Sequence, residues 1–426
     1  MIRASASQSS TTDLAPMTHA ATTGSASDQP GITFGAISAA MAFGTVVFLA
    51  MATAPIMLGA LVSAGRLTNQ TLGLVAMVET LGIALGATVG PEFLRAGGLR
   101  TKVAIACLVL AGLNAVCVSA SGAEQLGALR CACGLAEGLI LAGANLILTY
   151  SRNPEGMNGY FLGITTAPQV VATYVLPGYA IPRFGPNIGF ELMAAVSLCG
   201  AVAALAASTR HVPPRSARQG QALRWGPLAW AAMAAIVIQN AGVGAGYSYV
   251  VQIAKQLGVS DQVVGVSMAG LQATAFLGAI LVGVWAWRYS QMVILTAGCA
   301  LQAVVTLGLA QWNVPTAYLI GCCLFGMCWN ALLPYSLKLL LELDPSRRLG
   351  LMNGPTSLAG LSVGPLVASG FVRKADVAPA FSVAAAFFVC SGVAYLAINL
   401  ASRRSRAEGR DIGLEAHVLT PEAPTP

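Results

Sequence analysis

Long apolar runs separated by short polar segments recur along almost the whole chain. Each run is close to the length of about 20 residues with which a helix crosses a bilayer, whereas a β-barrel would show short segments of alternating polarity. The pattern therefore predicts an all-α membrane protein with twelve transmembrane helices. We place them at about 34–58, 69–93, 103–121, 126–150, 158–181, 188–207, 227–252, 262–286, 291–311, 316–340, 350–371 and 377–400.

The composition supports a membrane protein. Of the 426 residues, 56% are hydrophobic and 9% are charged, and the mean hydropathy is +0.71, whereas about a quarter of the residues in a soluble domain are charged. The net charge of +7 does not indicate nucleic-acid binding, because the basic residues lie between the spans. Their excess on one side predicts a multi-pass protein of the cell's inner (plasma) membrane with both termini in the cytoplasm.

A basic segment with two adjacent prolines divides the predicted spans into two sets of six. It reads TRHVPPRSARQGQALRW. The two ends of the chain lack apolar runs and are typical of disordered tails. These boundaries predict a cytoplasmic tail (1–31), a first six-helix half (32–208), a cytoplasmic linker (209–225), a second six-helix half (226–400) and a second cytoplasmic tail (401–426).

The two predicted halves are related in sequence. LTNQTLG at 67–73 aligns with VSDQVVG at 259–265, an offset of 192 residues. Two glycine pairs follow at the same offset: Gly86 with Gly278, and Gly134 with Gly326. This order indicates duplicated six-helix units. Because six spans return the chain to its starting side, the repeat is parallel, and such halves rock about a midplane site to give alternating access.

The loop after the second span carries a motif. It reads GPEFLRAGGLRTK, in which Gly90, Arg95 and Gly97 match the pattern Gly-x-x-x-Asp-Arg-x-Gly-Arg-Arg/Lys of the major facilitator superfamily. Leu94 stands where that pattern has Asp. Arg130 and Gly134 match an Arg-x-x-x-Gly pattern in span four of proton-coupled members.

With its topology and repeat, the chain resembles this superfamily over about residues 32–400. The resemblance implies secondary transport by two parallel six-helix repeats around a central cavity. It also implies a gating loop at Gly90, Arg95, Gly97 and, in the second half, Arg288. Span five keeps Gly163 and Pro168 of a motif found in family exporters but lacks its final glycine pair, which weakens the case for a drug exporter without excluding it.

Ionisable residues within the spans indicate function, because each costs about 2.5–3.5 kcal/mol to insert and such groups usually face a cavity. Glu79 lies in span two. Arg130 and Glu137 lie in span four, seven residues apart and hence on one helix face. Burial favours the protonated form of a carboxylate, and a nearby guanidinium favours the ionised form. We therefore expect proton coupling at Glu137, Glu79 and Arg130.

Structural roles for the same residues remain open. Arg130 and Glu137 would also serve as a pair that fixes span four to a neighbour. Glu79 would also serve as a hydrogen-bond anchor at a close helix contact, because it shares a face with small residues: Gly82, Gly86 and Gly90. The corresponding positions of the second half are not ionisable, and they hold Leu271, Cys322 and Trp329.

The second half offers polar and aromatic residues instead, so we expect the first half to titrate and the second to hold substrate. Arg130 and Lys338 would receive an anionic group, and Tyr247 and Trp329 would flank a planar body. The predicted substrate-binding residues are Arg130, Gln239, Asn240, Tyr247, Trp329, Asn330 and Lys338. Interhelical hydrogen bonding is the alternative role for the amides, and snorkelling to the membrane surface is the alternative for Lys338.

These residues favour proton symport of a small organic anion, and an aromatic anion is one form of this hypothesis. The alternative is proton-coupled export of hydrophobic drugs or metabolites. An enzyme is not expected, because the spans hold no cluster of catalytic or metal-binding side chains, and the ten cysteines are interpreted as small hydrophobes. No cofactor or metal is expected. The expected partners are a small-molecule substrate, protons and the lipid bilayer, and the chain is expected to act as a monomer.

The proton-coupling hypothesis makes a direct prediction. Glu137→Gln or Glu79→Gln is expected to abolish uptake driven by a pH gradient but to spare substrate exchange, because exchange needs no net proton movement. Uptake into proteoliposomes measures both activities. Undiminished pH-driven uptake in both variants would contradict the hypothesis.

Overall fold

The computed structural model describes residues 34–149, 154–206, 225–285, 290–311, 314–344 and 349–407. The first half comprises α1 (Phe34–Ser63), α2 (Asn69–Arg95), α3 (Leu99–Val118), α4 (Ala123–Thr149), α5 (Pro154–Val175), a π-helical turn η1 (Leu176–Ala180), α6 (Ile181–Phe184) and α7 (Ile188–Ala206). The second half comprises α8 (Pro227–Gln256), α9 (Asp261–Trp285), α10 (Gln291–Leu309), α11 (Pro315–Leu343), a 3₁₀ turn η3 (Leu349–Met352), α12 (Asn353–Ser369) and α13 (Ala378–Ala407).

Every predicted span corresponds to a helix or to a chain of contiguous helical segments, so the chain is an all-α membrane protein. Within the described residues, 10 helices are long and apolar enough to cross a membrane. Span five is divided, because the chain passes from α5 through the π-helical turn, which holds Pro177, into α6. Span eleven is the short α12, which the 3₁₀ turn precedes.

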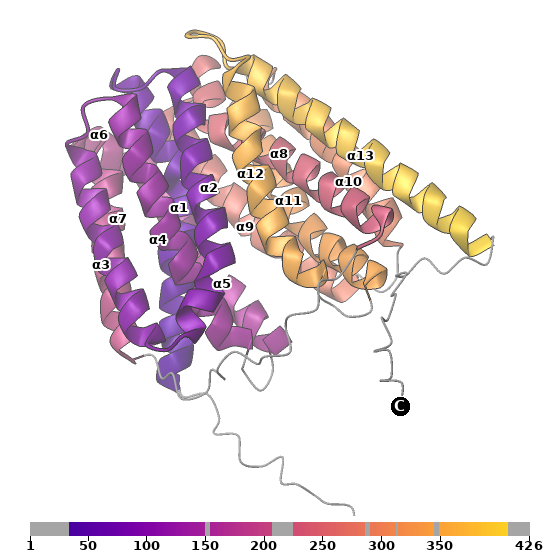
Figure 1. Cartoon of the computed structure of the whole chain (residues 1–426). Coiled ribbons are helices and arrows are strands. Elements are labelled where there is room, and N and C mark those ends of the chain that lie inside the picture. The colour runs from indigo at the N-terminus through magenta and orange to yellow at the C-terminus, as the bar shows by residue number, and fades with distance from the viewer. Residues whose placement is uncertain are drawn as a thin grey trace, which may run out of the picture.

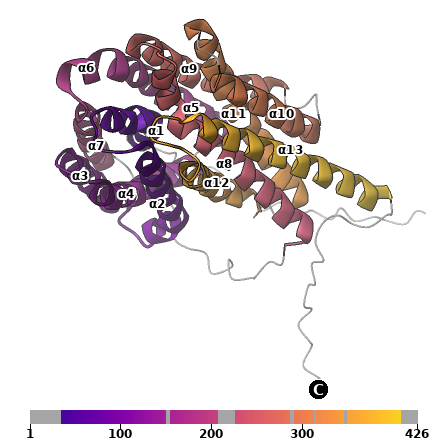
Figure 2. The same ribbon diagram turned by 90° about the horizontal axis from the view of Figure 1, so that it is seen from above.

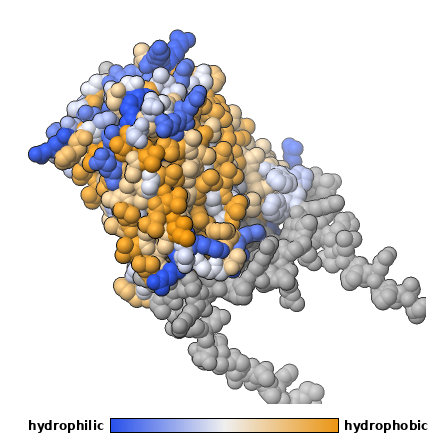
Figure 3. Space-filling view, turned by 60° about the vertical axis from the view of Figure 1, so that its left-hand side comes forward, coloured by the Kyte–Doolittle hydropathy of each residue, from blue (hydrophilic) through white to orange (hydrophobic). Residues whose placement is uncertain are grey.

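The helices form two bundles that lie side by side (Figures 1 and 2). Helices α1–α7, indigo to magenta, make one bundle, and α8–α13, rose to yellow, make the other. A broad apolar belt covers the face seen in Figure 3, with hydrophilic side chains gathered toward its two ends. This distribution suits a protein whose waist contacts lipid and whose two ends contact water.

Glycines set a close helix crossing in each half. In the first half, a Cβ on Gly134 of α4 would overlap the carbonyl oxygen of Glu79 in α2, and one on Gly86 would overlap that of Leu135. In the second half, α9 and α11 cross in the same way at positions 192 residues later: Gly326 against Leu271, and Gly278 against Met327. The offset seen in the sequence therefore corresponds to a repeated backbone contact.

Three predicted features lie partly or wholly outside the described residues. The two tails lie outside the described residues, except for the last turns of α13. The linker at 209–225 also lies outside them, except for Trp225. Arg288, the predicted gating residue of the second half, also lies outside them. The division into domains therefore stays a prediction.

The glycine crossings predict that alanine is tolerated less well at a glycine in a crossing than at a glycine that contacts no other helix. Gly134→Ala and Gly326→Ala are each expected to destabilise the protein by about 1–3 kcal/mol, the usual cost of inserting a methyl group into a filled contact. Gly112→Ala in α3 is the control, because a Cβ there would meet no atom within 4 Å. The melting temperature of the purified protein in detergent measures the effect. Equal melting temperatures for the three variants would contradict it.

Candidate functional site

A buried ion pair links α2 to α4 in the first half. Arg130 donates from Nε to Oε2 of Glu79 at 2.9 Å, and its Nη2 contacts Oε1 of the same carboxylate. The two parallel contacts form the bidentate arrangement that makes arginine–carboxylate pairs strong. Arg130 is 1% exposed and Glu79 is 3% exposed. The pair forms because the glycine crossing at Gly134 brings α2 against α4 one turn away from Arg130.

Asn114 of α3 completes the surroundings of the guanidinium. Its Oδ1 accepts a hydrogen bond from Nη1 of Arg130 at 3.0 Å, and its own amide donates to the carbonyl oxygen of Leu110. Phe190 of α7 lies against the guanidinium, with its ring centre 5.8 Å from the central carbon. Sequence reasoning missed Asn114, although a lone amide within the apolar run at 103–121 was the available signal.

Glu137 is buried beside this pair but is not part of it. The side chain is 0% exposed, and neither of its carboxylate oxygens has a hydrogen-bond partner among the described residues. Its nearest cationic atom is Nη2 of Arg130 at 3.9 Å, which Glu79 already engages. Two carboxylates thus share one guanidinium. A bound proton would balance the charge, because an unpaired ion in an apolar interior is costly.

The structure thus brings the three predicted proton-coupling residues together, but it pairs them differently from what the sequence indicated. Arg130 pairs primarily with Glu79 on another helix, and Glu137 on its own helix is the more distant partner. The guanidinium is enclosed by α2, α3, α4 and α7, all of the first half. Substrate contact by Arg130 stays a prediction.

A second cluster lies where the two halves meet. The rings of Tyr247 in α8 and Trp329 in α11 lie 5.3 Å apart at 57°. The hydroxyl of Tyr247 donates to the carbonyl oxygen of Ala52 in α1 at 2.9 Å and accepts from the amide of Gln272 in α9 at 3.3 Å. Gln272 was missed by sequence reasoning, although it is a polar residue near the middle of a predicted span. Residues from α1, α8, α9 and α11 therefore converge here.

The remaining predicted substrate residues divide into two groups. Gln239 accepts a hydrogen bond from the Tyr395 hydroxyl at 2.7 Å, and Asn240 donates to the carbonyl oxygen of Ile236 in its own helix. Both amides are buried and engaged within the second half. Asn330 and Lys338 of α11 are half-buried and, among the described residues, make no hydrogen bond or ion pair. They lie eight residues apart, two turns along the helix and about 80° apart around its axis.

Hydrogen bonds between the two halves gather at one end of the molecule. Within the described residues, they lie around the end of α1, the start of α2 and the end of α8. Besides the Tyr247 contact, they are Gln252 Nε2 to Gly59 O (3.3 Å), Lys255 Nζ to Ser63 Oγ (2.8 Å), Tyr249 Oη to Asn69 O (3.0 Å), Asn69 Nδ2 to Lys374 O (3.0 Å) and Gln70 Nε2 to Val372 O (3.2 Å). These contacts close the interface at that end.

The predicted gating loop lies at the opposite end of α2. Gly97 has a φ of 95°, which favours glycine and turns the chain out of the helix. Lys102 donates to the carbonyl oxygen of Phe93 at 2.6 Å, so its positive charge stabilises the partially negative C-terminal end of α2. Leu94, which replaces the family's Asp, is buried in the core. A gating function for Gly90, Arg95 and Gly97 stays a prediction.

Comparisons with known proteins agree with this architecture. The sequence profile of the Major Facilitator Superfamily matches residues 32–355, whereas no curated protein matches the chain. A mutant of the nucleoside transporter NupG is similar in structure, with a TM-score of 0.72 and 12% identity over 86% of this chain and 100% of that one. The inward-facing, occupied form of a bacterial homologue of the human lysosomal transporter Spinster has a TM-score of 0.66 and 14% identity, over 88% of this chain and 97% of that one.

The buried ion pair predicts non-additive mutations. Glu79→Leu or Arg130→Cys, which introduce the residues of the second half, each leave a buried charge without its partner, at a cost of about 3–5 kcal/mol. The double variant removes both charges and is expected to be more stable than either single variant, because apolar residues often replace a buried pair at little cost. Melting temperatures of the four proteins measure this. A double variant whose loss equals the sum of the single losses would contradict it.

Proposed function

The chain belongs to the Major Facilitator Superfamily, and we propose that it imports a small organic anion with a planar or aromatic body together with protons. The buried Glu137 carboxylate, for which the described part of the chain supplies no hydrogen-bond partner, carries this proposal. The alternative function is proton-coupled export of hydrophobic drugs or metabolites. The family supports transport in either case.

Alternating access is supported by the position of the contacts between the halves. With both termini in the cytoplasm, as we propose, the end where α1 meets α8 faces outward. The closed contacts at this end then correspond to an inward-facing state, and one structural neighbour is described as inward-facing. Outward opening requires contacts such as Lys255 to Ser63 and Gln252 to Gly59 to break.

Glu137 is the proposed proton carrier. Arg130 is held by Glu79 and Asn114, so its charge is already balanced and its position is fixed. The charged and titratable groups around Glu137 are Arg130, Glu79 and the Cys133 thiol. An additional negative charge on Glu137 has no cation of its own, so the site is neutral when Glu137 holds a proton. We assign to Glu79 the role of anchor for Arg130.

The substrate site is proposed at the interface cluster. Tyr247 and Trp329 present aromatic faces for a planar body. Asn330 follows Trp329 in α11, and Lys338, about two turns further along the same helix, supplies a cation that no described residue neutralises. Substrate bound against Tyr247 would act on the hydroxyl that joins α8 to Ala52 of α1. Substrate binding and the contact between the halves would thus be coupled through one side chain.

Transport into proteoliposomes tests the proposal with three probes. Benzenesulfonate is an aromatic anion that stays charged and does not cross the bilayer as a neutral acid. Uridine is included because the structural neighbour NupG is described as a nucleoside transporter, and tetraphenylphosphonium represents a hydrophobic drug. Acid outside is expected to drive accumulation of benzenesulfonate. Glu137→Gln is expected to reduce this accumulation at least tenfold and to preserve benzenesulfonate exchange without a gradient.

Glu124→Gln is the matched control, because Glu124 is an exposed carboxylate at the start of α4, the helix that holds Glu137. It is expected to transport at the wild-type rate. Proton-driven expulsion of tetraphenylphosphonium without uptake of benzenesulfonate would favour the exporter. Full pH-driven accumulation in Glu137→Gln would overturn the assignment of Glu137.

A further inference from the structure

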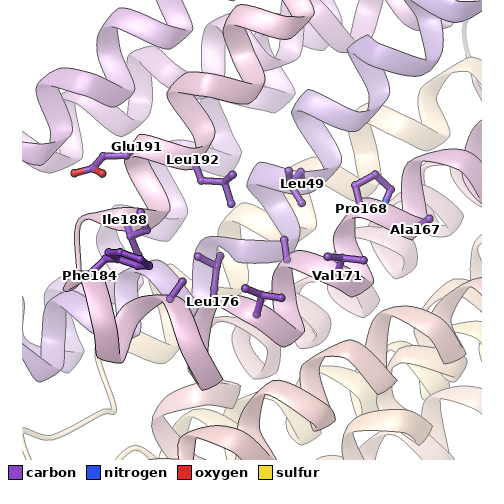
Figure 4. A pocket seen from close by; sticks show the side chains of 12 residues that line it. Leu49, Ala167, Pro168, Val171, Leu176, Phe184, Ile188, Glu191 and Leu192 are labelled. Carbon is purple, nitrogen blue, oxygen red and sulfur yellow. The ribbon is translucent and has the colours of Figure 1, made fainter.

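A pocket of about 810 Å³ is lined by residues of the first half, none of which belongs to the interface cluster. It lies between α5 and α7, both of which pack against α1, and it is bounded by the π-helical turn and α6 (Figure 4). Its lining is apolar except for Glu191, which stands at its edge. Its lining residues also exclude the proposed proton-coupling residues Glu137, Glu79 and Arg130.

The depth of the pocket matches half of the membrane. Leu49, near the middle of α1, and Pro168, near the middle of the chain from α5 to α6, line one end. Phe184 and Glu191, at the end of α6 and the start of α7, line the other. A bilayer has a hydrocarbon core of about 30 Å, so the pocket extends from the membrane surface to about the midplane.

The pocket opens toward the bilayer. Its rim includes the exposed side chains of Val171 and Phe184, whereas Ala172 and Leu176 form a buried floor. The π-helical turn holds Pro177 and offsets the chain between α5 and α6, as such turns often do at functional sites. The apolar rim excludes a polar ligand and favours a hydrocarbon.

We propose that this pocket binds one acyl chain of a phosphatidylethanolamine molecule from the leaflet at that end, with the ammonium headgroup against Glu191. Atoms that line an empty apolar groove lose their contacts, so a groove that opens toward the bilayer favours an occupant. At this depth a membrane supplies hydrocarbon to fill it. Glu191 is exposed and has no ion-pair partner among the described residues, so it offers a negative charge at headgroup level to a cationic group.

Native mass spectrometry of the delipidated protein tests the proposal. The protein is mixed with equal amounts of phosphatidylethanolamine, phosphatidylcholine and phosphatidylglycerol that carry the same acyl chains. One phosphatidylethanolamine is expected to remain bound in preference to the other lipids. Ala180→Trp, which fills the pocket, is expected to reduce this adduct at least fivefold. Ala195→Trp is the matched control, because Ala195 is an exposed alanine of α7 that does not line the pocket, and it is expected to retain the adduct.

The headgroup contact has its own test, since Glu191→Gln is expected to bind phosphatidylethanolamine and phosphatidylcholine equally. Ala167→Trp, at the midplane end of the pocket, repeats the filling test if Ala180→Trp does not fold. Wild-type lipid retention in a folded filling variant would overturn the proposal. A second outcome would also overturn it: the wild type retains no lipid but binds tetraphenylphosphonium, and Ala180→Trp loses that binding. The pocket would then hold a transported cation.

Discussion

The contact between the backbone of α2 at Glu79 and Gly134 of α4 determines the geometry of the first half. It fixes the distance between the two helices, because no side chain separates them. A carboxylate and a guanidinium that are far apart in sequence thereby come within bonding distance. The Glu79–Arg130 pair therefore lies inside one bundle and does not have to break when the two bundles move relative to each other. The proposed proton carrier is instead Glu137, whose carboxylate oxygens have no hydrogen-bond partner among the described residues.

The second half shows what the crossing requires by itself. Gly326 meets Leu271 in the same way, yet the positions that correspond to Glu79 and Arg130 hold Leu271 and Cys322, both fully buried. The crossing is thus compatible with an apolar interior. Because a buried ion pair contributes little net stability compared with apolar residues, stability alone does not account for the charges of the first half. This asymmetry favours a specific role for them over a general structural one.

The apolar runs of the sequence predicted the spans correctly, because burial in lipid requires about 20 apolar residues whatever the neighbouring helices are. The partners of the polar residues were harder to predict. The relation between Arg130 and Glu137 follows from helix geometry alone. The pairing of Arg130 with Glu79 and Asn114 depends on which helices are adjacent and how closely they approach. The bond from Tyr247 to Ala52 has a backbone acceptor, and no side-chain pattern reveals such an acceptor.

The contacts that close the interface between the halves are mostly of this kind. Tyr247, Tyr249 and Gln252 each donate to a backbone carbonyl of the other half, and so do Asn69 and Gln70. A carbonyl is present whatever the side chain at its position, so the accepting positions can change during evolution without loss of the contact. Only the donor positions require a particular side chain. The amide and phenol side chains that donate these bonds are therefore expected to vary less during evolution than the residues whose carbonyl groups accept them.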